Sequence, residues 1–313
     1  MENMMLKSKH TGKSIAALVG LSFVNGIGPK MFEKLVDRFD SPEEIRNASI
    51  DELCKIPRLT SKIAEAIRAI NLGAVETELM ALEEFGITVV TRYDKSYPQN
   101  LKTISDAPPV LFQTGDFQDE DNRAVAVVGT RQPGQRGRKI ATELAYGLAE
   151  LGFTIVSGLA LGIDTAAHQG ALQAGGRTIA VLGSGIKVIH PNQNQGLAEE
   201  IRRSGAIFSE LHPNTRPATG TLMSRDRIIS GLALGTIIVE ANENSGSMDT
   251  AKRTRIQRRK LFAVANENKG NRKLIAEGAY PIADVTQASL KQIAEILTMT
   301  DMKTPDESQI SLF

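Results

Sequence analysis

Three short loops of glycine and small polar residues are the places where this chain could bind a phosphate. They are Gly129-Thr130-Arg131, Ser157-Gly158 and Gly183-Ser184-Gly185, and Lys187 follows the third loop closely. Backbone N–H groups in such loops bind phosphate oxygens together with a guanidinium or ammonium group. The residues therefore predict an anion site. The alternative is that these glycines only make tight turns between strands and helices.

The common nucleotide motifs are absent from these loops. The glycines of the first loop stand at 129, 134 and 137, which is not the G-x-G-x-x-G spacing of a dinucleotide fingerprint. Gly12-Lys13-Ser14 resembles the end of a P-loop, but Lys7 stands where that motif needs glycine. We therefore expect neither NAD nor ATP, and the sequence predicts no cofactor and no metal.

Apolar runs that must be strands precede all three loops. Residues 125–128, 153–156 and 178–182 are almost wholly apolar, which is typical of strands buried on both faces. Between the first two runs, Ile140, Leu144, Leu148 and Leu151 have helical spacing. Strand, helix and strand predict parallel pairing with a right-handed crossover, and ligands bind beyond the carboxyl ends of such strands.

The same alternation continues along most of the chain and predicts an α/β fold. Residues 84–290 are expected to form an extended Rossmann-like, doubly wound and mostly parallel sheet. Within it, residues 216–220 are predicted as a loop before a helix that starts at Ser224. Residues 291–313 are polar and predict a flexible tail.

Residues 1–83 predict a small all-helical domain of the helix-hairpin-helix or SAM-like type. Residues 24–30 contain the G-I-G of a helix-hairpin-helix motif, whose backbone N–H groups bind phosphate. Residues 54–60 resemble this segment, with Pro57 and Leu59 expected in place of the two glycines. Such domains bind the DNA backbone or other proteins. The near-neutral charge favours the protein-binding use.

Composition limits the class of protein. The chain has 313 residues, of which 41% are hydrophobic, and a net charge of +1, so any basic surface must be local. Its single cysteine, Cys54, excludes internal disulfides and fits a reducing cytoplasm. No apolar run approaches membrane-spanning length, so no membrane association is expected.

Several unusual segments occur together in one order and resemble a known family. They are VVGTR (127–131), SGLALGIDTAAHQGAL (157–172), TIAVLGSGIKVIHP (178–191), RDRIISGL (225–232) and VEANENSGSMDTA (239–251). Through these segments the chain resembles the DprA/Smf family, DNA processing protein A. The resemblance implies a non-enzymatic, cytoplasmic protein that binds single-stranded DNA and forms a homodimer. It also implies help in loading a RecA-type recombinase during DNA uptake by natural transformation or during recombination.

The resemblance also implies which residues bind DNA. Arg131 corresponds to the phosphate-binding arginine of the family's G-[ST]-R loop, and Ser157-Gly158 and Gly183-Ser184-Gly185 are expected to line the same groove. Arg225 and Arg227 correspond to R-N-R, and Ser245-Gly246-Ser247 to S-G-S.

The sequence also departs from the family pattern at several positions. Asp226 replaces the usual asparagine, Lys187 a common acidic residue and His190 a tyrosine, and no winged-helix domain follows the sheet. These departures indicate a divergent member of the family.

Charge gives independent support for such a groove. Arg131, Lys187, Arg225 and Arg227 are all predicted on loops at one edge of the sheet, where they could follow a phosphate backbone. A basic helix extends this track or only solubilises the surface, and its cations are Lys252, Arg253, Arg255 and Arg259. Asp164 and His168 are expected to be a structural pair near a helix start.

Two other functions remain open. One is a nucleotide-binding or nucleoside-monophosphate-hydrolysing Rossmann-like protein, with Glu240 and residues 245–247 near its catalytic position, although the motif match is poor. The other is an adaptor with a vestigial groove.

The chain ends in a candidate docking peptide. The last five residues, with Gln309, Leu312 and Phe313 as anchors, resemble the Q-L-S-L-F peptide that docks on the replicative sliding clamp.

Overall fold

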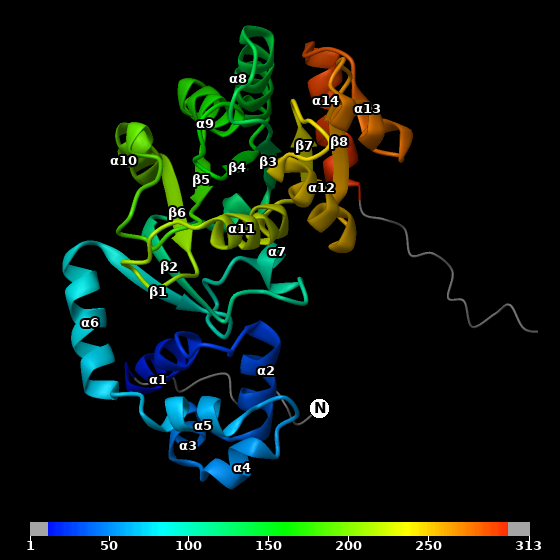
Figure 1. Cartoon of the computed structure of the whole chain (residues 1–313). Helices are drawn as coiled ribbons and strands as arrows, with labels where there is room; N and C mark the ends of the chain where they lie inside the picture. The colour runs from blue at the N-terminus through cyan, green and yellow to red at the C-terminus, as the bar shows by residue number, and fades with distance from the viewer. Residues whose placement is uncertain (1–11, 300–313) are drawn as a thin grey trace, which may run out of the picture.

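The computed structural model describes residues 12–299 and divides them into a helical region and a sheet region (Figure 1). The candidate clamp-binding residues Gln309, Leu312 and Phe313 lie outside the described residues. None of the helices within residues 12–299 combines the length and apolar character needed to cross a membrane.

Six helices form the N-terminal region of the molecule, at the bottom of Figure 1 in blue to cyan. They are α1 (Gly12–Ser22), α2 (Pro29–Arg38), α3 (Pro42–Asn47), α4 (Ile50–Cys54), α5 (Ser61–Arg68) and α6 (Leu72–Glu84). Each of the helices α3 to α6 begins at a side chain that accepts a hydrogen bond from a backbone N–H group of the first turn. These N-cap residues are Ser41, Ser49, Thr60 and Asn71.

The two hairpins of this N-terminal region have the same turn. Gly26 has φ +96° in the first turn, and Arg58 has φ +76° in the second. Arg58 therefore takes the place of the first glycine, and Thr60, the N-cap of α5, takes that of the second. Pro57 and Leu59 were predicted at these positions, which is wrong by one residue. The two turns align by their positive φ values, and the side-chain types alone do not reveal that alignment.

The rest of the described chain alternates between strands and helices, as predicted. The strands are β1 (Ile87–Thr91), β2 (Val110–Gly115), β3 (Ala124–Val128), β4 (Thr154–Ser157), β5 (Thr178–Val181), β6 (Gly205–Ser209), β7 (Gly235–Ile238), β8 (Lys260–Val264) and β9 (Tyr280–Ile282). The helices are α7 (Gln99–Lys102), α8 (Gln135–Glu150), α9 (Ile163–Gln173), α10 (Gln195–Ser204), α11 (Thr219–Leu232), α12 (Gly246–Ile256), α13 (Lys269–Ala276) and α14 (Gln287–Thr298).

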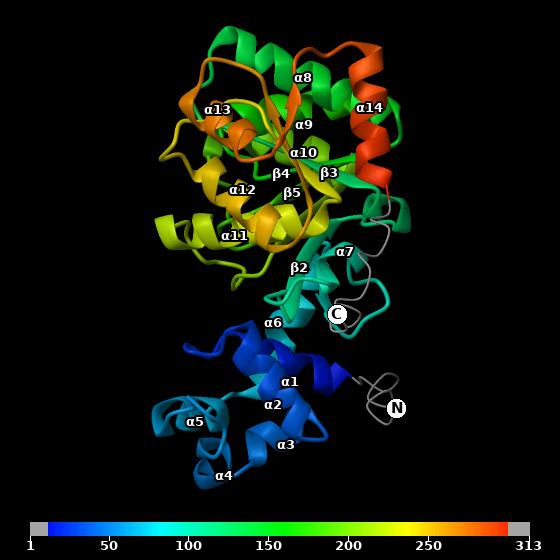
Figure 2. The same ribbon diagram turned by 90° about the vertical axis from the view of Figure 1, so that its right-hand side faces the viewer.

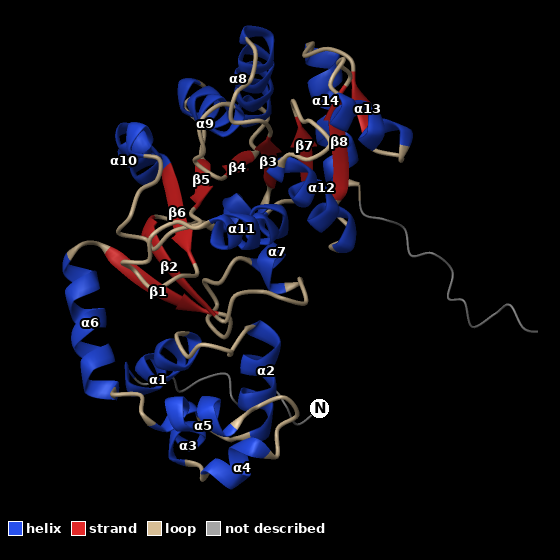
Figure 3. Ribbon diagram, viewed as in Figure 1, coloured by secondary structure: helices blue, strands red, loops and turns tan. Residues whose placement is uncertain are grey.

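All nine strands that the structure describes join one sheet in the order β1-β2-β6-β5-β4-β3-β7-β8-β9 (Figure 3). The pairs from β6 to β9 are parallel, whereas β1 with β2 and β2 with β6 are antiparallel. The predicted Rossmann-like, mostly parallel sheet behind a helical domain is confirmed.

The period of two in β3 separates the two layers of helices. Val125 and Val127 pack with residues of α8, α9 and α14, whereas Ala126 and Val128 pack with residues of α11, α12 and α13. All five residues of β3 are buried, so its continuous apolar sequence follows from having a helical layer on each face.

The helical region packs against the antiparallel edge of the sheet, below it in Figure 2. The ring of Phe23, after α1, stacks on Phe112 of β2 with a centroid distance of 5.9 Å. Phe23 also contacts His212, whose Nε2 lies 3.2 Å from a carboxylate oxygen of Glu78 in α6. A single hydrophobic core therefore runs from α1 into the sheet.

Two sequence predictions about element bounds need correction. Helix α11 begins at Thr219, so the predicted loop at 216–220 ends earlier and the start at Ser224 is wrong. The structure also forms α14 from residues assigned partly to the tail, because Leu290, Ile293 and Leu297 make a buried helical stripe. The polar composition of residues 291–313 predicts a tail, whereas the spacing of these three apolar residues predicts a helix.

Candidate nucleic-acid interface

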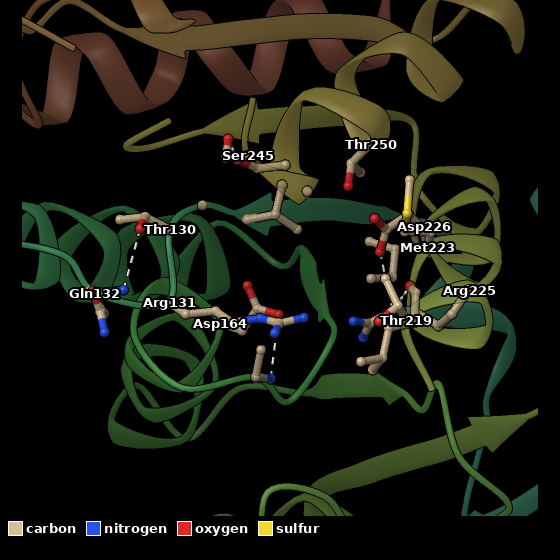
Figure 4. Close-up of a pocket in the computed structure, with 17 residues that line it drawn as sticks. Thr130, Arg131, Gln132, Asp164, Thr219, Met223, Arg225, Asp226, Ser245 and Thr250 are labelled. Carbon is tan, nitrogen blue, oxygen red and sulfur yellow. Dashed lines mark hydrogen bonds and ion pairs between the residues drawn. The ribbon is translucent and has the colours of Figure 1, made fainter. Parts of the chain in front are cut away.

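The neighbours β3 and β7 mark the place where the strand order reverses. From β3 the chain winds through β4, β5 and β6 to one side, and from β7 through β8 and β9 to the other. Ligands of open α/β sheets bind in the crevice that such a reversal leaves beyond the carboxyl ends of the strands. A cavity of about 510 Å³ opens here between the loop after β3 and helices α11 and α12 (Figure 4).

The loop after β3 forms one wall of the cavity and is held by backbone hydrogen bonds. The N–H of Thr130 donates to the carbonyl of Glu240 at 2.7 Å, and the N–H of Ile163 donates to the carbonyl of Thr130 at 3.2 Å. Gly162 has φ +89°, and a Cβ there would lie 2.5 Å from the Thr130 carbonyl oxygen. This close approach requires glycine.

Arg131 extends from this fixed loop into the cavity (Figure 4). Its side chain is exposed and makes no ion pair with any residue between 12 and 299. A guanidinium group that is free of protein partners on a rigid loop is suited to binding a phosphate. The structure thus places Arg131 where the sequence predicted the anion site.

The start of α12 forms a second wall. Ser245, Gly246 and Ser247 all line the cavity, and the two serine hydroxyls lie 2.9 Å apart. The first N–H groups of a helix have no intrahelical acceptor, and the helix dipole favours an anion there. Ser245-Gly246-Ser247 and Arg131 therefore face the same space, because β7 lies next to β3 in the sheet.

Ser157 and Gly158 do not line this space, contrary to expectation. Ser157 is fully buried, and its hydroxyl donates to the carbonyl of Val127 at 2.7 Å. The carbonyl of Gly158 accepts a hydrogen bond of 2.6 Å from Nη1 of Arg225, so close that a Cβ at Gly158 would collide with the guanidinium group. Ser157 and Gly158 therefore lie behind Arg225 and support the wall of the cavity that it lines.

The predicted loop of Gly183, Ser184 and Gly185 is also buried and makes structural bonds. The hydroxyl of Ser184 donates to the carbonyl of Val188 at 2.6 Å, and the N–H of Gly185 donates to the carbonyl of Thr215 at 2.8 Å. These residues fix the turn after β5 and do not line the cavity at β3 and β7.

Lys187 is exposed but belongs to a different cavity. Its Nζ lies 4.6 Å from the ring centroid of Phe85, and both residues line a space of about 440 Å³ beside α10. The predicted single groove with Arg131 is therefore wrong for Lys187, because the turn after β5 directs it toward the helical region.

The two arginines of α11 are buried, which corrects their predicted place on a surface loop. Arg225 is 5% exposed and donates through Nη1 to the carbonyls of Gly158 and Val181, while its Nε lies 3.1 Å from Oδ1 of Asp226. Arg225 lines the cavity with most of its donors already used.

Arg227 does not line this cavity at all. Both terminal nitrogens of Arg227 donate to the carboxylate of Glu210 at 2.6 Å, and its Nε donates to the carbonyl of Asp106 at 3.1 Å. Burial alone would lower the pKa of Arg227, but Glu210 holds the net pKa above its usual value. This buried, ion-paired arginine joins α11 to the loop before β2.

Two carboxyl groups lie beside the cationic end of the cavity. Asp164 accepts hydrogen bonds from the N–H groups of Gly158 and Ala160, and burial raises its pKa although Arg225 opposes the shift. Burial also raises the pKa of Asp226 to about 6, again against the effect of Arg225. The cavity therefore holds an acidic wall as well as cationic groups.

His168 has a separate structural role. Its Nδ1 lies 2.7 Å from the hydroxyl of Thr178, and burial lowers its pKa to about 3. Asp164 and His168 make no hydrogen bond to each other within residues 12–299. Asp164 stabilises the loop after β4, whereas His168 joins α9 to the start of β5, so they are not the expected pair.

The basic helix α12 offers fewer free cations than predicted. Arg253 lies 3.3 Å from the carboxylate of Asp249, and Arg255 lies 2.5 Å from that of Glu277. Arg259 donates to the carbonyl of Asn100 and the hydroxyl of Thr103. Lys252 is exposed and forms no ion pair among the described residues, so one of the four predicted cations is available to DNA.

Three uncharged polar residues that were not predicted also line the cavity, namely Gln132, Thr219 and Thr250. Gln132 directly follows Arg131 in the sequence, and this position could have predicted that it lines the same cavity. Thr219 was missed because the start of α11 was predicted too late. Thr250 lies one helical turn after Gly246, on the same face of α12, and helical spacing would have found it.

Comparisons with known proteins follow the same division of the chain. The family model described as DNA recombination-mediator protein A matches residues 88–293, and that of SAM-like helix-hairpin-helix tandems matches residues 19–69. Protein Smf of Synechocystis sp. is 35% identical over 277 residues, which are 85% of this chain and 69% of that protein.

Two solved structures are similar to the chain over long stretches. The X-ray structure of DNA processing protein A (DprA) from Streptococcus pneumoniae has a TM-score of 0.77 and 31% identity, and covers 91% of this chain and 98% of that one. DNA processing protein A from Helicobacter pylori, described for its unique single-stranded DNA binding mode, has a TM-score of 0.61 and 29% identity over 67% of this chain and 96% of that one. The chain belongs to the DNA recombination-mediator protein A family, DprA/Smf.

Proposed function

We propose that the chain binds single-stranded DNA in the cavity at β3 and β7, as a DNA-processing protein of uptake or recombination. Arg131 and the first N–H groups of α12 bind one phosphate, and the apolar side chains of Leu222 and Met223 contact the attached nucleoside. The observation that carries this proposal is the exposed Arg131, which has no ion pair among the described residues and shares one cavity with Ser245-Gly246-Ser247. The Helicobacter pylori relative described as binding single-stranded DNA supports it.

Family membership supports the remaining parts of the proposal. We infer a cytoplasmic homodimer that assists the loading of a RecA-type recombinase on the bound strand. The proposed role is binding and not catalysis. Glu240, the candidate catalytic residue of the hydrolase alternative, does not line the cavity. Its carboxylate lies beneath the first turn of α8, where a Cβ at Gly137 would meet it at 2.0 Å.

Fluorescence anisotropy with a labelled oligothymidine tests the proposal. Arg131→Ala should weaken binding at least tenfold, about 1.4 kcal/mol, because a charge-assisted phosphate contact is lost. Binding should also weaken steeply with salt, since aromatic side chains are scarce and most of the affinity is electrostatic.

The matched control is Arg203→Ala. Arg203 is exposed in the last turn of α10, and β6 starts directly after this helix. Arg203 therefore lies near the amino ends of the parallel strands, whereas the cavity lies beyond their carboxyl ends. Its removal lowers the net charge equally and should leave the affinity unchanged. Equal losses in the two variants, or none with Arg131→Ala, would reject the cavity as the DNA site.

A further inference from the structure

A group of cations that the cavity does not explain lies directly after Arg131. Residues 129–142 contain no acidic side chain, and Arg136, Arg138 and Lys139 lie in the first turns of α8. All three are exposed. We call Arg131, Arg136 and Arg138 the α8 cation cluster.

The α8 cation cluster differs from most other arginines of the sheet region in having no protein partner. Arg177, Arg225, Arg227, Arg253 and Arg255 all make ion pairs with carboxylates. Within residues 12–299, neither Arg136 nor Arg138 makes an ion pair or a side-chain hydrogen bond. Folding therefore leaves these two guanidinium groups available.

The charges around the cluster do not cancel it. Lys139 is balanced by Glu143 at 3.7 Å, one turn later in α8. The carboxylate of Glu240 lies beneath Gly137 and is partly buried. Asp164 and Asp226 line the cavity that Arg131 enters, and Asp284 lines the one that Arg136 borders. Within residues 12–299, none of these carboxylates forms an ion pair with the cluster. Exposed cations without ion pairs favour binding of a polyanion.

The two guanidinium groups of α8 lie on different sides of the helix start. Arg136 and Lys139 border a cavity with residues 282–285 after β9. Arg138 lies one turn before Thr142, whose hydroxyl is 3.4 Å from the carbonyl of Ala166 in α9, so Arg138 lies toward α9. A chain of phosphates that leaves the cavity past Arg131 and Gln132 meets this helix start first, because α8 begins three residues after Gln132.

We propose that the first turn of α8 binds the phosphates next to the one in the cavity, through Arg136 and Arg138. This inference rests on the proposed function and extends it: the cavity holds one nucleotide, and α8 sets the direction in which the single strand leaves. The site is therefore longer than the cavity, and its outer part has no contact with the bases.

Strand length separates the two parts of the site. We would measure the affinities of oligothymidines of about 5 and about 20 nucleotides for the wild type and for Arg136→Ala with Arg138→Ala. The double variant should lose about tenfold or more on the long strand and less than about twofold on the short one. The slope of log K against log salt should fall by about 1.4, since each lost phosphate contact of a single strand contributes about 0.7.

Arg203→Ala is again the control for charge alone, and circular dichroism verifies the fold of each variant. An unchanged affinity for the long strand in the double variant, with Arg131→Ala still weak, would overturn this inference and leave the proposed function intact. Equal losses on both lengths would also overturn it. Absence of binding by the wild type would overturn both.

Discussion

Arg131 and Arg225 face the same cavity, yet they have opposite roles. The guanidinium group of Arg225 is bonded to the carbonyls of Gly158 and Val181 and to Asp226, whereas that of Arg131 has no ion pair with any described residue. A buried guanidinium group without these acceptors would greatly lower the free energy of unfolding. The bonds of Arg225 therefore have a structural role and stabilise the ends of β4 and β5. Of the two arginines, Arg131 has the guanidinium group available to bind a phosphate.

We expect Asp226 to make the proposed affinity for DNA depend on pH. Burial raises its pKa to about 6, Arg225 opposes the shift, and Asp164 and Asp249 add to it while Thr250 opposes it. A phosphate in the cavity raises this pKa further, so binding takes up a proton. We therefore expect the affinity of the wild type to rise as the pH falls from about 7.5 toward 6, and to level off below that.

The Asp226→Asn variant isolates this effect. Anisotropy titrations at about pH 7.5 should show several-fold tighter binding than the wild type, because a negative charge beside the phosphate is gone. Between about pH 7.5 and 5.5 the variant should show a smaller rise than the wild type, because Asp164, whose pKa burial also raises, remains in both proteins. All other residues are the same in both proteins, so their contributions cancel in the comparison. A parallel pH dependence in the two proteins would show that another group is responsible.

At the scale of elements, the loop from β3 to α8 depends on its contact with the start of α9. Gly162 combines φ +89° with a predicted Cβ distance of 2.5 Å to the Thr130 carbonyl oxygen. Gly162→Ala should lower the free energy of unfolding by about 3 kcal/mol, from backbone strain and from the collision. Urea unfolding followed by circular dichroism measures this loss, and DNA affinity should fall although no charge changes.

Gly175→Ala provides the matched control for this loop. Gly175 also has a positive φ, +66°, but nothing lies within 4 Å of its predicted Cβ. It should lose only about 1 kcal/mol and keep its affinity for DNA. Similar losses in the two variants would mean that the close approach of the loop to α9 has no energetic importance.

The sequence predicted the elements far better than it predicted the surroundings of charged residues. Apolar runs gave the strands β3, β4 and β5, because burial on both faces leaves a local pattern. The burial of Arg227 depends on Glu210 and Asp106, which are distant in the chain, so no local pattern reveals it. Among predicted site residues, Arg131 and Ser245-Gly246-Ser247 meet because β7 inserts beside β3, and sequence order alone does not show that.

At the scale of the whole molecule, the helical region and the sheet share one core. Phe23 contacts Phe112 and His212, and Phe112 is fully buried in β2. Phe23→Ala should therefore lower the free energy of unfolding by about 2 kcal/mol, less than for a fully buried ring. Hydrogen exchange followed by mass spectrometry should show faster exchange in β2 as well as in α1.

Ile45→Val tests whether this coupling is specific. Ile45 is buried in α3, a helix that packs against α1, α2 and α5. The variant should lose about 1 kcal/mol of the free energy of unfolding. Hydrogen exchange should become faster in the helices and stay unchanged in β2. If Phe23→Ala also left β2 unaffected, the two regions would be independent units.

The bonds of Arg225 have a consequence for the rate of binding. Arg225 donates to the carbonyls of Gly158 and Val181, which follow or end the β-strands β4 and β5. These two strand ends are therefore joined before DNA binds. Association then needs no slow rearrangement of the protein, and its rate is set by diffusion and by the attraction of the α8 cation cluster. Differences between DNA strands will accordingly appear in their residence times, while all of them arrive at similar speed.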